Sequence, residues 1–356
     1  MSTLWIHAGP HKTASTYIQQ TLISNKSYLR KKGLLVCPNM ALAKRFRKFF
    51  GSGDFESIAS LKFIQKAVRG DKLLSTEALH PQILTARSVA KLQRLSREIG
   101  LGIGLVFYIR NQPEWINSMY CHGIRRMYHA DGFPAFARSW FVQDNYKTLD
   151  LCKKFENIVN SGFETKFIVL GGARRSDPVS DLLNEIGVAF EPSKLVPVAE
   201  GSSNIQPGVK GIWLSKSCKV ICDLLGVETS DLRFKARKVR NIAIKKNWHL
   251  ERFFGFDKDL YEETANHFGP TNDAFARQFL GGSWRDHFPL KSVVKNEYLG
   301  PVDCDELLEL KESFVEALVG MNFPSARLDE AIQLFLGYAK ENNVHASNLR
   351  DCHSYG

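Results

Sequence analysis

The segment WIHAGPHKTASTYIQQTL, near the start of the chain, combines a short apolar run with groups that can bind an anion. The apolar run, residues 4–6, breaks at Gly9-Pro10, and a helical pattern begins a few residues later. A turn between a strand and a helix exposes unpaired backbone N–H groups and the positive end of the helix dipole. The side chains in this turn are those of His11, Lys12, Thr13, Ala14, Ser15 and Thr16. The segment therefore predicts an anion-binding loop.

This loop does not follow the pattern of ATP- and GTP-binding P-loops. The motif G-x-x-x-x-G-K-[ST] requires glycine at the positions of Ile6 and His11. A plain helix N-terminus capped by hydroxyl side chains is the alternative interpretation.

A second pair of candidate anion ligands follows the apolar run 104–109. Arg110 ends this run, and Ser118 follows eight residues later in a helical pattern. A guanidinium group presents a planar fork of donors to phosphate oxygens, and a serine hydroxyl adds a neutral hydrogen bond. Arginine and serine at this spacing occur by chance in most proteins, so the evidence is their position directly after a predicted buried strand.

Two features of the sequence resemble the sulfotransferase family. The order Lys12-Thr13-Ala14-Ser15-Thr16 is similar to its K-[ST]-G-[ST]-[ST] loop, with alanine in place of the usual glycine. Arg110 and Ser118 resemble the strand-end arginine and helical serine that hold the 3′-phosphate of 3′-phosphoadenosine-5′-phosphosulfate (PAPS) in that family. The resemblance covers residues 1–190 and looks closest to the bacterial carbohydrate-type members. Residues 272–282 are also similar to a late stretch of the family near the acceptor site.

The resemblance implies an activity, a donor and an acceptor class. We expect transfer of a sulfuryl group from PAPS to a hydroxyl or amine of a carbohydrate or glycolipid, with Lys12 as a catalytic residue and no metal. Sulfotransferases use a glutamate or a histidine as the base, and both types follow the apolar run 72–76, as Glu77 and His80. We favour Glu77 because it leaves the predicted strand directly. A helix-capping glutamate is the alternative interpretation of Glu77.

The predicted elements place these residues at one edge of a sheet. Short apolar runs at 3–8, 34–37, 72–76, 104–110 and 165–170 alternate with amphipathic stretches at 16–31, 55–69, 87–99, 112–128 and 145–160. Apolar runs without strict alternation are typical of strands covered on both faces. The alternation predicts an α/β fold, a parallel sheet between two helical layers, with ligands at the carboxyl ends of the strands. Together with the resemblance, it predicts a three-layer, P-loop-like sulfotransferase fold.

The second half of the chain has a different pattern, mainly helical from about residue 207. Residues 304–341 predict two helices separated by GMNFPS. We expect one sulfotransferase domain over residues 1–300, with a coenzyme-binding core at 1–190 and a helical acceptor-side part at about 200–300. Residues 301–356 are expected to form a helical extension packed on the same domain.

The charge of the chain indicates an anionic partner. The 356 residues carry a formal net charge of +11, and seven Lys or Arg residues lie within 233–246 with no acid among them. Residues 233, 237 and 240 are expected to share one helical face. This segment predicts a docking strip for an acidic polysaccharide, and a solvated helix is the equally weighted alternative. No nucleic-acid-binding motif accompanies it, so we expect no nucleic-acid partner.

The remaining features of the sequence indicate the cellular location of the protein and the state of its cysteines. They also leave two other functions open. No apolar run approaches the roughly 18 residues of a membrane span, and no signal peptide is evident, so we expect a cytoplasmic protein. The seven cysteines indicate neither a disulfide framework nor a zinc site, and we expect them to be reduced. A nucleotide or sugar kinase of related fold and a non-catalytic polyanion-binding protein remain alternatives to a sulfotransferase.

Overall fold

The computed structural model describes residues 2–10, 12–37, 40–53, 58, 70–144, 147–173, 177–196, 198 and 205–342. The chain divides into two compact units, each built from three segments. Residues 1–115, 139–203 and 263–291 form the sheet unit, and residues 116–138, 204–262 and 292–356 form the helical unit. These borders do not coincide with the contiguous ranges expected from the sequence, which stay a prediction.

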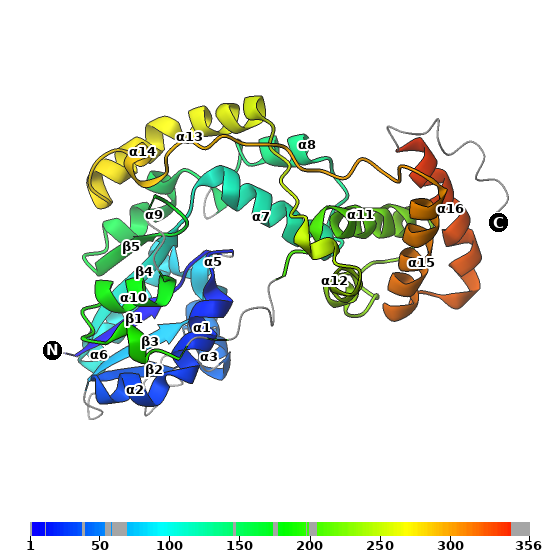
Figure 1. Ribbon diagram of the computed structural model, residues 1–356. Coiled ribbons are helices and arrows are strands. Elements are labelled where there is room, and N and C mark those ends of the chain that lie inside the picture. The colour runs from blue at the N-terminus through cyan, green and yellow to red at the C-terminus, as the bar shows by residue number, and fades with distance from the viewer. Residues whose placement is uncertain are drawn as a thin grey trace. The chain divides into compact units, whose positions relative to one another are not determined.

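The sheet unit contains five parallel strands, in the order β2-β3-β1-β4-β5 (Figure 1). The strands are β1 (Thr3–His7), β2 (Leu34–Cys37), β3 (Asp71–Ser75), β4 (Gly102–Ile109) and β5 (Glu164–Val169). All five predicted strands are confirmed, each to within two residues. The fold is therefore α/β, with an all-parallel sheet flanked by helices.

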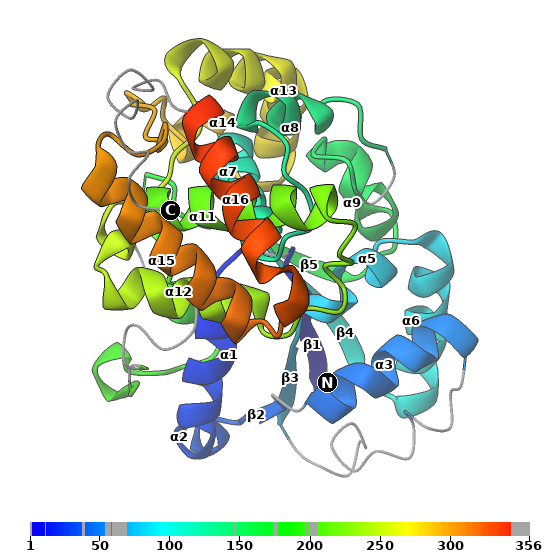
Figure 2. The same ribbon diagram turned by 90° about the vertical axis from the view of Figure 1, so that its right-hand side faces the viewer.

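Both faces of this sheet are covered by apolar cores. Ile6 and Phe107 pack into one core, whereas their neighbours Trp5 and Val106 pack into the other. The first core includes residues of α3 (Met40–Ser52), α6 (Ala86–Ile99), α9 (Leu151–Val159) and α13 (Lys258–Phe279). The second includes residues of α1 (Ser15–Ser24), α2 (Lys26–Lys31) and α10 (Pro178–Glu185). Figure 2 shows α1 and α2 on one side of the strands and α3 and α6 on the other.

The helical unit has an apolar core of its own. Trp213, Phe314 and Phe335 are buried in it. Its elements include α11 (Gly208–Leu224), α12 (Lys235–Lys245), α15 (Cys304–Gly320) and α16 (Leu328–Glu341). The mainly helical character after residue 207 and the two helices within 304–341 are therefore confirmed. Helices α7 (Gln112–Arg125) and α13 each begin in one unit and end in the other.

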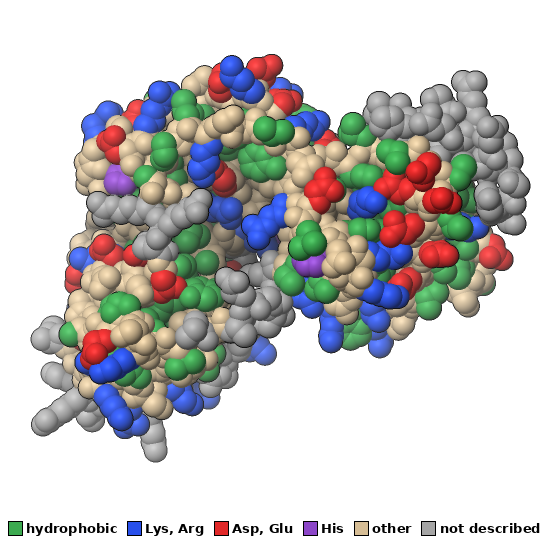
Figure 3. All heavy atoms as spheres, viewed as in Figure 1, with side chains coloured by type: hydrophobic (Ala, Val, Ile, Leu, Met, Phe, Trp, Pro, Cys, Tyr) green, Lys and Arg blue, Asp and Glu red, His purple; other side chains and the backbone are tan. Residues whose placement is uncertain are grey.

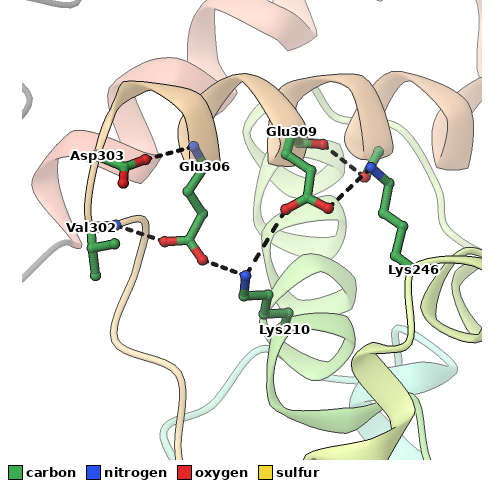
Figure 4. A network of polar contacts seen from close by, with 7 residues as sticks. Lys210, Lys246, Val302, Asp303, Glu306 and Glu309 are labelled. Carbon is green, nitrogen blue, oxygen red and sulfur yellow. Dashed lines mark hydrogen bonds and ion pairs between the residues drawn. The ribbon is translucent and has the colours of Figure 1, made fainter.

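A network of ion pairs joins three helices of the helical unit (Figure 4). Lys210 of α11 pairs with Glu306 of α15 and, at 4.0 Å, with Glu309. Lys246, the residue after α12, pairs with the same Glu309 at 3.2 Å. The backbone N–H of Val302 donates to Glu306 at 2.7 Å. Single exposed ion pairs contribute little, but this partly buried network fixes the start of α15 against α11 and α12.

Among the described cysteines, one departs from the expected reduced state. Cys37, Cys121, Cys152, Cys218 and Cys222 are free thiols. Cys304 is disulfide-bonded, so the expectation is wrong there. The expected cytoplasmic location stays a prediction. Within the described ranges, no helix is long and apolar enough to cross a membrane.

Candidate anion-binding site

The loop between β1 and α1 has the backbone conformation of an anion site. Lys12 has φ +71° and Ala14 has φ +58°, both in the left-handed region that favours glycine. Left-handed residues at alternate positions of a loop turn successive N–H groups toward one side, which forms an anion-binding concavity. Ala14 stands where the sulfotransferase pattern has glycine, and its left-handed φ explains why glycine suits that position.

Two fully buried polar atoms beside the loop have no hydrogen-bond partner among the described residues. They are the hydroxyl oxygen of Ser15, the first residue of α1, and Nε2 of His7, the last residue of β1. Ser15 is 3% exposed and His7 is 0% exposed. A buried polar group without a partner costs roughly 1–3 kcal/mol. A bound anion would remove that cost at Ser15.

The other predicted loop residues differ in their roles. The hydroxyl of Thr13 donates to the carbonyl oxygen of Pro10 at 2.6 Å, so it holds the turn. Thr16 is half-buried in the first turn of α1. His11 lies outside the described residues.

The need for glycine at position 9 of this loop is apparent only from the structure. A Cβ atom at this position would lie 2.9 Å from Nε2 of His7 and 2.9 Å from Oγ1 of Thr13. Any side chain here would collide with both groups. The sequence marks Gly9 as a turn residue but does not reveal this close approach.

Arg110 lies at the loop. It directly follows β4, the neighbour of β1, and its Nη1 donates to the carbonyl oxygen of Lys12 at 3.0 Å. Burial lowers the pKa of Arg110, and the carboxylate of Glu114 opposes that shift. Two residues that the sequence separates by 98 positions therefore meet here. Ser118 lies half-buried on α7, in the helical unit.

A buried amide pair fixes the chain just after Arg110. Nε2 of Gln112 donates to Oδ1 of Asn272 at 2.6 Å, and Nδ2 of Asn272 donates back at 2.9 Å. Nε1 of Trp284 donates to the side chain of Asn111 at 3.3 Å. Sequence reasoning missed the partner of Asn272, although this residue begins the 272–282 segment that resembles the family.

The two candidate bases, both after β3, have different surroundings. Glu77 begins a short 3-10 helix (Glu77–Leu79) and is half-buried. Burial lowers the pKa of His7, the last residue of β1, to about 4. The negative charge of Glu77 opposes this shift, because Glu77 lies near the end of β1. His80 is 6% exposed, and its Nδ1 donates to the carbonyl oxygen of Ala8 at 2.8 Å. The ring of His80 also packs edge-on against Phe107, so it supports the core under the loop.

The site thus collects a lysine, an arginine, backbone N–H groups and a buried hydroxyl where β1 and β4 end, with a carboxylate after β3. No family model, curated protein or solved structure matches this chain.

The basic segment 233–246 is less uniform than expected. Helix α12 begins at Lys235, after Phe234 with φ +56°, so Arg233 does not share the expected helical face. Lys245 pairs with Glu316 at 3.5 Å, and Lys246 pairs with Glu309. Figure 3 shows Lys and Arg side chains around α12, and Asp and Glu side chains over α15 and α16.

Proposed function

We propose that this chain is a PAPS-dependent sulfotransferase that acts on a hydroxyl or amine of a carbohydrate or glycolipid, with the three-layer fold of that family. The observation that carries the proposal is the hydrogen bond from Arg110 to the backbone of Lys12. The two elements that resemble the family's coenzyme-binding groups are adjacent in space.

The residues present suit the charge of PAPS. In the proposal, Lys12, the backbone N–H groups of residues 12–16 and the hydroxyls of Ser15 and Thr16 hold the 5′-phosphosulfate. Arg110 holds the 3′-phosphate through charge-assisted hydrogen bonds. The assignment of Ser118 to that phosphate rests on the resemblance alone. The buried, unpartnered hydroxyl of Ser15 is the structural support for an anion at the loop.

Bound PAPS supplies the sulfuryl group and a phosphate leaving group. The S–O bond to the 5′-phosphate breaks, an S–O bond to the acceptor oxygen forms, and the acceptor loses its proton. Like loose phosphoryl transfer, the reaction requires positioning and charge stabilisation from the protein. Lys12 stabilises the negative charge that grows on the bridging oxygen. Glu77 accepts the proton of the acceptor, because Nδ1 of His80 is hydrogen-bonded to the carbonyl oxygen of Ala8 beneath the loop.

A kinase that uses ATP is the alternative with related chemistry. Its P-loop would need glycine at position 6, where Ile6 is buried within β1. This observation favours a sulfotransferase.

A transfer assay with radiolabelled PAPS and a panel of carbohydrate and glycolipid acceptors tests the proposal. Lys12→Ala should abolish transfer while it weakens binding of the product 3′,5′-adenosine bisphosphate (PAP) less, because its strongest interaction forms in the transition state. Lys26→Ala, an exposed lysine on α2, is the matched control and should keep full activity. Unchanged kcat in Lys12→Ala, with affinity for PAP lost, would show that Lys12 only binds the donor.

A further inference from the structure

The chain directly after Arg110 is held by side chains from one distant segment of the sheet unit. Three side chains within residues 111–114, where β4 has ended and α7 begins, each contact a side chain within residues 272–291. The pairs are Asn111 with Trp284 at 3.3 Å, Gln112 with Asn272 at 2.6 and 2.9 Å, and Glu114 with Lys291 at 3.0 Å. The end of α13 and the residues after it therefore fix the first turn of α7.

Gln112 and Asn272 form the most directional of these contacts. Gln112 is 3% exposed and Asn272 is 2% exposed, and each amide both donates to and accepts from the other. Nε2 of Gln112 also donates to the carbonyl oxygen of Leu149 at 3.2 Å. A buried amide that is displaced from its partner leaves polar atoms unsatisfied, so the pair is stable in one relative placement of the two side chains. Two apolar side chains would fill the same space without fixing a direction.

Arg110 lies between this pair and β4. On the strand side, the backbone N–H of Leu170 donates to the carbonyl oxygen of Ile109 at 2.8 Å. On the helix side, Gln112 follows Arg110 two residues later. The backbone of Arg110 is therefore held on both sides, and its guanidinium reaches the loop, where Nη1 donates to the carbonyl oxygen of Lys12. A shift in the first turn of α7 would move this guanidinium relative to the loop.

We propose that the Gln112–Asn272 pair positions Arg110 for the 3′-phosphate, and so determines specificity for a nucleotide that carries both a 3′- and a 5′-phosphate. A planar fork of donors binds a phosphate well only within about 0.5 Å and 10–20° of its best geometry. The pair itself touches no ligand and acts through Arg110. The inference rests on the proposed function, because that proposal assigns the 3′-phosphate to Arg110.

Calorimetric titration of the full chain with PAP and with adenosine 5′-monophosphate (AMP) tests the proposal, because AMP lacks only the 3′-phosphate. Asn272→Leu removes the amide and keeps a similar volume. It should weaken binding of PAP about 10-fold to 100-fold and binding of AMP less than about 3-fold. A merely structural role would weaken both ligands equally or neither of them, and either result would overturn the proposal.

A double-mutant cycle with Arg110→Gln checks that the pair acts through Arg110. Once Arg110 is replaced, Asn272→Leu should cause no further loss of PAP binding, and additive losses would overturn the proposal. Asn157→Leu is the matched control. The side chain of Asn157, on α9, donates to the carbonyl oxygen of Leu84 at 3.0 Å and not to the turn after Arg110. This control should bind both nucleotides as the wild type does.

The exchange of Gln112→Asn with Asn272→Gln decides the matter if Asn272→Leu does not fold. The exchange keeps both amides and the total number of side-chain atoms, whereas Gln112→Asn alone shortens one side of the pair. Gln112→Asn alone should lower the preference for PAP over AMP about 10-fold, and the exchange should restore most of it. No recovery would contradict the proposal. A wild type that binds PAP no better than AMP would contradict the proposed function as well, whereas a preference for PAP that Asn272→Leu leaves unchanged would overturn this inference alone.

Discussion

His7 is a histidine whose charge state depends on whether the chain is folded. Its side chain is fully buried at the end of β1, and its Nδ1 lies 2.8 Å from the hydroxyl of Ser75. Burial lowers its pKa from 6.5 to about 4, against the opposing charge of Glu77. The imidazole beneath the loop is therefore neutral near pH 7 and brings no positive charge to the site.

This shift predicts how stability changes with pH. Above pH 6.5 both states hold a neutral imidazole, and as the pH falls toward 4 the unfolded chain gains a proton that the folded chain does not. The contribution of His7 should therefore destabilise the fold by about 2 kcal/mol at pH 5 relative to pH 7. Urea unfolding of the wild type and His7→Gln at both pH values measures it. The variant should lose less stability on acidification, and equal losses would contradict the assignment.

Glu77 and His80 should separate catalysis from stability. Loss of a general base typically slows a reaction by ~10²–10⁴. Glu77→Gln preserves shape, so kcat should fall by that factor while affinity for PAP is kept. His80→Asn should keep most activity and lose about 1–3 kcal/mol of stability, because it removes a buried hydrogen-bond donor. Transfer kinetics and urea unfolding of both variants check this, and the reverse pattern would make His80 the base.

At the scale of the elements, the cap of helix α3 is a feature that a local sequence pattern does not reveal. Its carboxyl end is held by Lys91 of α6, whose Nζ donates to the carbonyl oxygens of Phe49 at 3.2 Å, Phe50 at 2.6 Å and Gly51 at 3.4 Å. A lysine at this end also interacts favourably with the helix dipole. The cap lies about forty residues away in the chain, and the sequence does not predict this helix.

Removing that cap should loosen α3. Lys91→Met keeps the apolar stem and should cost about 1 kcal/mol of stability, because it removes a charge-assisted helix cap. Lys44→Met, at an exposed position on the same helix, is the control and should change stability little. Thermal or urea unfolding gives both values. Equal effects of the two substitutions would show that Lys91 does not act as a cap.

The strands were predictable because a strand buried on both faces is recognisable within a few residues, as at 34–37 and 104–109. The loop and Arg110 were predictable for the same reason, since each directly follows such a strand. The amide pair of Gln112 and Asn272 was not, because its partners are 160 residues apart. That each unit draws on three separate segments does not follow from a local pattern either.

At the scale of the whole molecule, the basic residues behind the net charge of +11 differ in their surroundings. In the sheet unit, Lys12 and Arg110 converge on one loop. In the helical unit, Lys245 and Lys246 pair with Glu316 and Glu309 of α15. Net charge alone predicts attraction to anions. The arrangement distinguishes basic residues that converge on the loop from basic residues that are paired with carboxylates.

The measurement that tests the central claim most directly is a calorimetric titration of the full chain with PAP and, separately, with Mg-ATP. The loop, Arg110 and the buried hydroxyl of Ser15 predict micromolar binding of PAP, which carries both a 5′- and a 3′-phosphate, and negligible binding of Mg-ATP. At 100 times its dissociation constant, PAP should also stabilise the fold by about 2.7 kcal/mol. Preferential binding of Mg-ATP, or no binding of PAP, would contradict the assignment of this site to PAPS.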